Sequence, residues 1–186
     1  RNVDRSRIAN DSVAGCGGEG FSLTNGSDTN TLEQLSSVSN NGNGININLS
    51  SFNVVRYSRS RQNTNSAGLA IGTGAKNQII GNEITGNQTQ GIDISFGGDG
   101  NLIHGNYISG NAQVGIRIYN NDASVITAND IRGSDTGVWI LGTSTGHVVR
   151  KNNIGSAVNH IFTANSLAQT ITRNWFGSAD SVTIKA

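Results

Sequence analysis

Residues 77–100 read NQIIGNEITGNQTQGIDISFGGDG, and residues 101–124 read NLIHGNYISGNAQVGIRIYNNDAS. Aligned without a gap, these two 24-residue units share ten residues, most of them Gly, Asn and Ile. A fixed period of this length is typical of solenoids, in which each repeat buries its apolar face against the next one. The sequence therefore predicts a repeat array rather than an ordinary globular domain.

A Gly–apolar–x–apolar motif extends the repeat along nearly the whole chain. Such a motif is typical of a short strand with two side chains facing inward and one facing outward. It begins at Gly20, Gly44, Gly68, Gly91, Gly115 and Gly137, with degenerate copies at Asn159 and Ser181. These positions lie 22–24 residues apart and predict about eight rungs, where a rung is one turn of the chain. No helix fits into so short a turn, so each strand is expected to pair in parallel with its equivalent ~4.8 Å along the axis.

A second motif, apolar–x–x–Asn–x–apolar, precedes the first in each rung. It places one column of asparagines at Asn82, Asn106, Asn129, Asn152 and Asn174. Asparagine tolerates the left-handed conformation of a sharp bend, and stacked asparagine amides hydrogen-bond to their copies above and below. The glycines that open the first motif, from Gly44 to Gly137, are expected at bends with positive φ.

This pattern resembles the repeat of the pectate-lyase-like superfold. The resemblance covers nearly all of the chain and implies a right-handed, single-stranded parallel β-helix, here one domain over residues 1–186. The superfold includes polysaccharide lyases, hydrolases and epimerases, phage tailspikes, adhesins and a periplasmic copper-site maturation family. Since neither end has a capping segment and solenoids need polar caps, the chain is expected to be a fragment of a longer protein.

Composition narrows the classes of partner. The chain has 13 basic and 12 acidic residues, a net charge of +1, which does not favour nucleic acid. No apolar run is long enough to span a membrane. With no Met, a single Cys16, and His104, His147 and His160 at unrelated repeat positions, neither a metal site nor another cofactor is expected.

The outward positions of the main strand form ladders down the coil. The first ladder is predicted to contain Ser22, Asn46, Ala70, Asp93, Arg117, Trp139, Ile161 and Thr183. The second is predicted to contain Thr24, Asn48, Gly72, Ser95, Tyr119, Leu141, Thr163 and Lys185. Together they gather Asp93, Arg117, Tyr119 and Trp139 on one face within roughly 10 Å along the axis.

A carboxylate, a guanidinium and two aromatic rings suit a sugar chain, because rings stack on apolar sugar faces and charges bind hydroxyls or carboxylates. Asp93 and Arg117 are the candidate catalytic residues. A hydrolase would pair Asp93 with a second carboxylate ~5–10 Å away, at Asp122 or Asp99. The candidate substrate-binding residues are Tyr119, Trp139, Asp122 and Asn46. The structural alternative is that Asp93 and Arg117 merely form an ion pair between neighbouring rungs.

Arginines at positions 56, 59 and 61 surround Tyr57 and resemble a basic patch. Without a basic net charge, a solvated face is the favoured interpretation of these residues. Arg59 and Glu83 lie one rung apart and are expected to form a salt bridge.

The sequence thus predicts a polysaccharide-directed domain located extracellularly or on a cell or virion surface. If it is an enzyme, it is expected to be a lyase, hydrolase or epimerase. The alternative is the non-catalytic rod of an adhesin or phage tailspike, whose outward face serves oligomerisation. Besides the polysaccharide, the expected partners are two further copies in a homotrimer or another chain that caps the coil.

Overall fold

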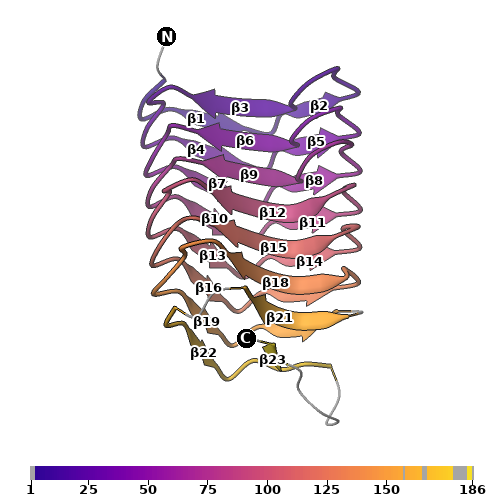
Figure 1. The fold of residues 1–186 in the computed structure, drawn as a ribbon. Coiled ribbons are helices and arrows are strands. Elements are labelled where there is room, and N and C mark those ends of the chain that lie inside the picture. The colour runs from indigo at the N-terminus through magenta and orange to yellow at the C-terminus, as the bar shows by residue number, and fades with distance from the viewer. Residues whose placement is uncertain (1–2, 157, 165–166, 178–183, 186) are drawn as a thin grey trace.

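The computed structural model describes residues 3–156, 158–164, 167–177 and 184–185, which form a right-handed parallel β-helix. The chain winds around a single axis, and each turn lies directly on the one before it (Figure 1). Within these ranges no helix is long and apolar enough to cross a membrane.

Three parallel sheets form the sides of the coil. Sheet A contains β1 (Arg7–Ala9), β4 (Thr31–Glu33), β7 (Val54–Arg56), β10 (Gln78–Ile80), β13 (Leu102–His104), β16 (Val125–Thr127), β19 (Val148–Arg150) and β22 (Thr170–Thr172). Sheet B contains β2 (Ser12–Ala14), β5 (Ser36–Val38), β8 (Arg59–Arg61), β11 (Glu83–Thr85), β14 (Tyr107–Ser109), β17 (Asp130–Arg132) and β20 (Asn153–Gly155). Sheet C contains β3 (Phe21–Thr24), β6 (Ile45–Asn48), β9 (Leu69–Gly72), β12 (Gln90–Ser95), β15 (Val114–Tyr119), β18 (Thr136–Leu141), β21 (Asn159–Thr163) and β23 (Ile184–Lys185).

The register of the central repeats confirms the sequence prediction. Ile92 pairs with Ile116 in sheet C, and Ile79 pairs with Ile103 in sheet A. Each pair joins residues 24 positions apart. Like side chains therefore stack on like side chains from one rung to the next.

These stacks make a thin hydrophobic core inside the coil. Its fully buried members include Ile47, Ile71, Ile79, Ile84, Ile92, Ile94, Ile103, Ile108, Ile116, Ile118, Ile126, Ile131, Ile140 and Ile154. Burial of apolar surface contributes ~25 cal/mol per Å², so these columns supply the main driving force for folding.

Buried asparagine ladders stabilise the corners. In the predicted column, the Nδ2 atom of Asn82 donates to Oδ1 of Asn106 at 3.0 Å, and Asn106 donates in the same way to Asn129 at 2.9 Å. Two further ladders, not predicted, occupy the other corners and consist of Asn30, Asn53, Asn77 and Asn101, and of Asn40, Asn63, Asn87 and Asn111. In these ladders each Oδ1 also accepts the backbone N–H of the ladder residue in the rung before it, so the ladders pair buried polar groups along all three corners.

The expectation of positive φ at the glycines opening the sheet C strands was wrong. Gly44, Gly68, Gly91, Gly115 and Gly137 all lie outside the left-handed region. They are required for space instead, because a Cβ on Gly91 would lie 2.6 Å from the Gly115 carbonyl oxygen and 2.6 Å from Ile108 Cγ2.

The predicted register also slips by one residue in the seventh rung. Val138 pairs with Ile161 and Trp139 with Phe162, so Ile161 is fully buried and Phe162 takes the outward position. Thr163 is likewise buried and not outward. Residues 181–183 of the eighth predicted motif lie outside the described residues.

Candidate functional site

The outer face of sheet C carries the predicted column of functional side chains. Asp93 on β12 pairs with Arg117 on β15, Arg117 with Trp139 on β18, and Trp139 with Phe162 on β21. Neighbouring members are therefore one rung, ~4.8 Å, apart. Alternation along each strand turns these side chains outward while the isoleucines beside them fill the core.

Asp93 and Arg117 form a bidentate ion pair. Arg117 Nε donates to Asp93 Oδ1 and Arg117 Nη2 donates to Asp93 Oδ2, both at 2.8 Å. The carboxylate is mostly covered, at 13% exposure, while the guanidinium side chain is 32% exposed. The hydrogen bonds to Asp93 raise the pKa of Arg117 above its ordinary value, against the opposing effect of burial. Charge-assisted fork geometry of this kind is strong and directional, so it fixes the guanidinium on the sheet surface.

Aromatic rings flank this ion pair. The Trp139 and Phe162 rings meet edge to face, with their centroids 6.0 Å apart. In the second outward column, Tyr119 pairs with Leu141 and packs edge to face on Phe96, centroid to centroid 5.4 Å. Sequence reasoning missed Phe96 and Phe162 as members of this face.

Phe96 follows β12 directly, in the corner that leads to sheet A. It has a φ of +62° and remains 61% exposed. A non-glycine residue in the left-handed region is strained, and here the strain accompanies the display of a large ring. The signal in the sequence was a phenylalanine outside any strand motif, directly before two glycines.

Asp122 is not brought into partnership with Asp93. It lies in the corner after β15, where its Oδ1 accepts the backbone N–H of Thr145 at 2.8 Å. Its own N–H donates to Oδ1 of Asp99 at 2.9 Å. The two corner aspartates therefore hold successive turns together, and Asp93 is instead occupied by Arg117.

Asn46 shares the outward column but lies two rungs from Asp93, with Ala70 between them. Its Nδ2 donates to Oε2 of Glu19 at 2.8 Å. Asn46 therefore extends the polar part of the face towards the N-terminal end without touching the ion pair.

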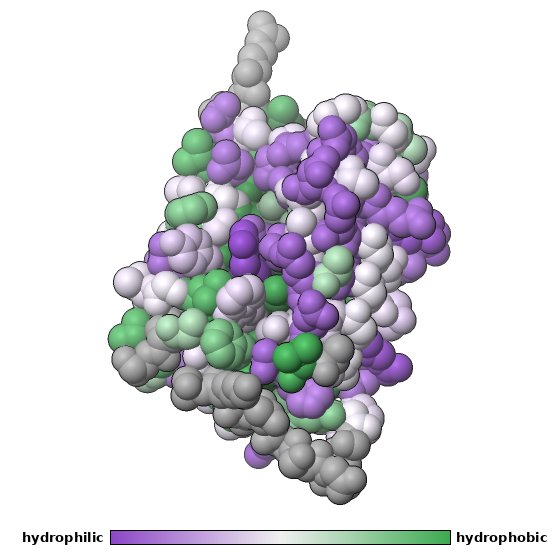
Figure 2. All heavy atoms as spheres, turned by 45° about the vertical axis from the view of Figure 1, so that its right-hand side comes forward, coloured by the Kyte–Doolittle hydropathy of each residue, from purple (hydrophilic) through white to green (hydrophobic). Residues whose placement is uncertain are grey.

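Surface character changes along the rod. Figure 2 shows mostly hydrophilic side chains over the upper part of the face that it brings forward, and more hydrophobic ones towards the lower end. Among the described residues near that end, Val158, Leu167 and Trp175 are exposed.

The three parallel sheets define a right-handed parallel β-helix protein. The family model described as "Periplasmic copper-binding protein (NosD)" matches residues 1–186. The chain therefore belongs to the NosD family. A comparison with curated protein sequences found no match.

Solved structures of similar fold include an alginate epimerase and a pectate lyase. The periplasmic alginate epimerase AlgG superposes with a TM-score of 0.70 at 16% identity, over 86% of this chain and 48% of that one. A variant of the same epimerase gives 0.62 at 16% identity, over 94% and 50%. The pectate lyase Pel9A gives 0.50 at 19% identity, over 88% and 51%. The chain thus spans about half the length of these proteins, and at such identities the likeness shows the fold alone.

The donor atoms of this chain do not fit a copper site. Copper selects thiolate, thioether and imidazole ligands, and the sequence has no Met and only Cys16. His104 ends β13 and is exposed, His147 is buried in a corner ladder, and His160 packs against the ring of Phe176. Within the described ranges no group of three or more His, Cys, Asp or Glu side chains could hold a metal ion.

Proposed function

We propose that this chain is a binding solenoid for an acidic polysaccharide, which lies along the outer face of sheet C. The observation that carries the proposal is the outward column of Asp93, Arg117, Trp139 and Phe162, one residue per rung. A regular ladder of this kind matches a ligand that is itself a linear repeat.

Arg117 supplies the charge selectivity. A guanidinium has five N–H groups, and the bidentate pair with Asp93 uses two of them. The rest are available to a sugar carboxylate on the partly exposed side of the group. Asp93 acts as a positioning residue that holds the guanidinium flat against the sheet.

The rings supply the apolar contact. Trp139, Phe162, Tyr119 and Phe96 lie on either side of Arg117 along the axis and across the sheet. Sugar rings have apolar faces that stack on such side chains, while their hydroxyls reach the polar groups between them.

The comparisons support the ligand class and the compartment. AlgG is described as an alginate epimerase and Pel9A as a pectate lyase, and both names refer to acidic polysaccharides. NosD and AlgG are both described as periplasmic. We therefore place this chain on the outer side of the cytoplasmic membrane.

Binding fits this face better than cleavage. A hydrolase needs two carboxylates flanking the scissile bond, one of them protonated. Here Asp93 is held by a guanidinium, and Asp122 and Asp99 accept backbone N–H groups at a corner.

Calorimetric titration of the 186-residue chain with trimers of galacturonate and mannuronate tests the proposal, with maltotriose as the neutral control. We expect Arg117→Ala to weaken acidic-trimer binding by about tenfold or more, which corresponds to ~1.4 kcal/mol. Arg132→Ala, which removes an ion pair within one strand of sheet B, should leave affinity unchanged. Equal binding by wild type and Arg117→Ala would overturn the proposal.

Asp93→Asn separates binding from catalysis. The variant frees Arg117 from its counter-charge, so acidic trimers should bind at least as tightly as to wild type. If wild type releases products from acidic polysaccharides and Asp93→Asn stops the release while still binding, then Asp93 is catalytic and a binding-only role is wrong.

A second candidate function is a non-catalytic structural rod that associates with further copies of itself through exposed side chains. It is favoured by Val158, Leu167 and Trp175, which expose apolar surface at the C-terminal rungs. Sedimentation equilibrium decides whether the chain forms trimers. A monomer at all concentrations would remove this alternative.

A further inference from the structure

A shallow pocket of about 280 Å³ lies at the corner where sheet A turns into sheet B. It is lined by Gln34, Leu35, Ser36, Tyr57 and Arg59, which belong to the second and third rungs. This corner joins the two sheets that lie behind sheet C in the view of Figure 1. The pocket is therefore separate from the face described above.

The backbone of this corner displays side chains where the next two rungs have none. Gln34 and Tyr57 occupy a left-handed position, with φ of +53° and +52°, and the same position is Gly81 and Gly105 in the following rungs. The Tyr57 ring lies against Gly81, where a Cβ would be 2.9 Å from ring atom Cε1. Tyr57 nevertheless stays 61% exposed, so its ring is open to a ligand.

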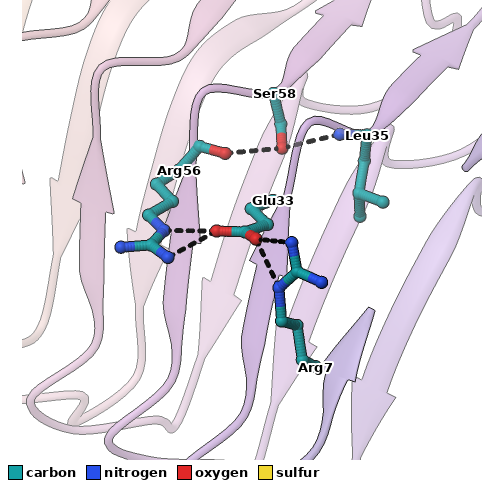
Figure 3. A network of polar contacts seen from close by, with 5 residues as sticks. All are labelled: Arg7, Glu33, Leu35, Arg56 and Ser58. Carbon is teal, nitrogen blue, oxygen red and sulfur yellow. Dashed lines mark hydrogen bonds and ion pairs between the residues drawn. The ribbon is translucent and has the colours of Figure 1, made fainter. Parts of the chain in front are cut away.

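Two further arginines lie on the strands of sheet A that lead to this corner. In Figure 3, the guanidiniums of Arg7 and Arg56 approach the carboxylate of Glu33 from opposite sides. Arg56 Nε donates to Glu33 at 2.6 Å, and hydrogen bonds from both arginines lower the pKa of Glu33. Because two guanidiniums share one carboxylate, this group carries a net positive charge, and its member Arg56 contacts the ring of Tyr57 in the pocket lining.

The ring of Tyr57 and the guanidinium of Arg59 are both held in place. Arg56 lies 5.9 Å from the centroid of the Tyr57 ring, a cation–π contact that fixes the ring at the pocket edge. Arg59 donates from Nε to Oε2 of Glu83 at 3.1 Å, and its side chain is largely exposed. That bond confirms the predicted salt bridge and leaves the two Nη groups of Arg59 for a ligand.

The lining therefore combines an aromatic ring, a guanidinium, an amide and a hydroxyl in a space near the lower limit of ligand pockets. The ring suits the apolar face of a sugar, and Gln34 and Ser36 suit its hydroxyls. The Arg59 guanidinium in the lining, with Arg56 beside the Tyr57 ring, selects a carboxylate. A nucleic acid is disfavoured, because the chain has a net charge of only +1 and one ring lines the pocket.

We propose that this corner pocket binds one carboxylate-bearing sugar unit, as a second carbohydrate site on a different side of the rod from sheet C. The ligand class is that of the proposed function, but the residues are different. The two sites can therefore fail independently in experiment.

Amide chemical shifts of the isotope-labelled 186-residue chain locate the binding of galacturonate and its trimer. We expect shifts at residues 34–36 and 57–61, and none from maltotriose. Tyr57→Ala and Arg59→Gln should each weaken binding at these amides by about tenfold. Tyr107→Ala is the matched control, since Tyr107 is an exposed tyrosine on sheet B away from the pocket, and it should bind like wild type.

Arg117→Ala makes the two proposals separable. It should weaken binding at the sheet C amides by about tenfold and leave binding at the corner unchanged, while Tyr57→Ala should do the reverse. The corner proposal is overturned if trimer shifts occur only on sheet C, or if Tyr57→Ala binds like wild type. It is also overturned if inorganic phosphate or a dinucleotide binds there as tightly as the acidic sugar, since either result identifies another ligand class.

Discussion

His147 accepts at Nδ1 the hydrogen bond that the backbone N–H of Ser124 donates, at 3.0 Å. Three rungs earlier in this column, the N–H of Asn53 donates to Oδ1 of Asn77 in the equivalent bond. A histidine thus accepts the ladder bond that asparagine side chains accept in the earlier rungs. Because Nδ1 is the acceptor, we assign the imidazole proton to Nε2, which is buried.

This substitution makes stability depend on pH. Burial lowers the pKa of His147 below its ordinary value of 6.5, against weaker opposing effects of a hydrogen bond with the Asn121 backbone and of the Asp122 and Asp99 carboxylates. The unfolded chain therefore binds a proton first as the pH falls, so folding stability is fully present above ~6.5 and decreases below it. Urea unfolding between pH 8 and 5.5 should show this decrease in wild type and a smaller one in His147→Asn. Parallel curves for the two proteins would contradict it.

Truncation of one ladder asparagine should destabilise two rungs at once. Asn106 donates to Ile79 O and to Asn129 Oδ1, and its own Oδ1 accepts from Asn82. We expect Asn106→Ala to lower the free energy of unfolding by about 3 kcal/mol, because the groups left behind are buried and unpaired. Ser109→Ala, at a half-buried outward position of the same rung, should cost less than ~0.5 kcal/mol. Equal losses in chemical denaturation would show that the ladder carries no special share of stability.

Two glycines of the repeat should respond differently to substitution. Gly91→Ala creates contacts of 2.6 Å with backbone and core atoms, so it should cost at least ~2 kcal/mol. Gly105 has a φ of +64° and open space around it, so Gly105→Ala should cost about 1 kcal/mol through backbone strain alone. Asparagine should rescue the second site and not the first, because it tolerates the left-handed region but is larger than alanine. Thermal unfolding of the four variants measures this order.

Copper should not bind this chain as a built site. The few imidazole and thiol donors lie in different parts of the coil, and no thioether is present. We expect only weak binding when the reduced chain is titrated with Cu(I) under a competing chelator, and with Cu(II) by electron paramagnetic resonance. A single tight site with one defined spectrum would refute this expectation.

The fold was predictable because its strongest signal is local and repeated. Ile92 and Ile116 occupy the same place in identical surroundings, so sequence spacing alone gives their contact. The Asn82–Asn106 bond follows from the same spacing and from the chemistry of amides. The Asp93–Arg117 ion pair was also accessible, since both belong to one outward column.

The remaining features depend on where the repeat departs from its pattern. Phe162 was misplaced because the seventh rung has no glycine to mark its strand and is one residue longer than the spacing suggested. Gly91 is required because Ile108, a residue of another sheet in the next rung, lies close to it. Local sequence propensity does not predict this contact. The position of Glu33 between Arg7 and Arg56 could be predicted only from the register of the irregular first rung, which the spacing of the motifs does not give.

In-register stacking also fixes the length of the rod by the number of its repeats. Each rung contacts only its neighbouring rungs. Removal of residues 101–124 would therefore pair β12 with β18 in sheet C and leave a coil that is one rung shorter, with its remaining corners intact. Asp93 would then face Trp139 with no guanidinium between them. The length of the rod is thus set by the number of repeats, and the chemistry at each position along the axis is set by the outward side chains of one repeat.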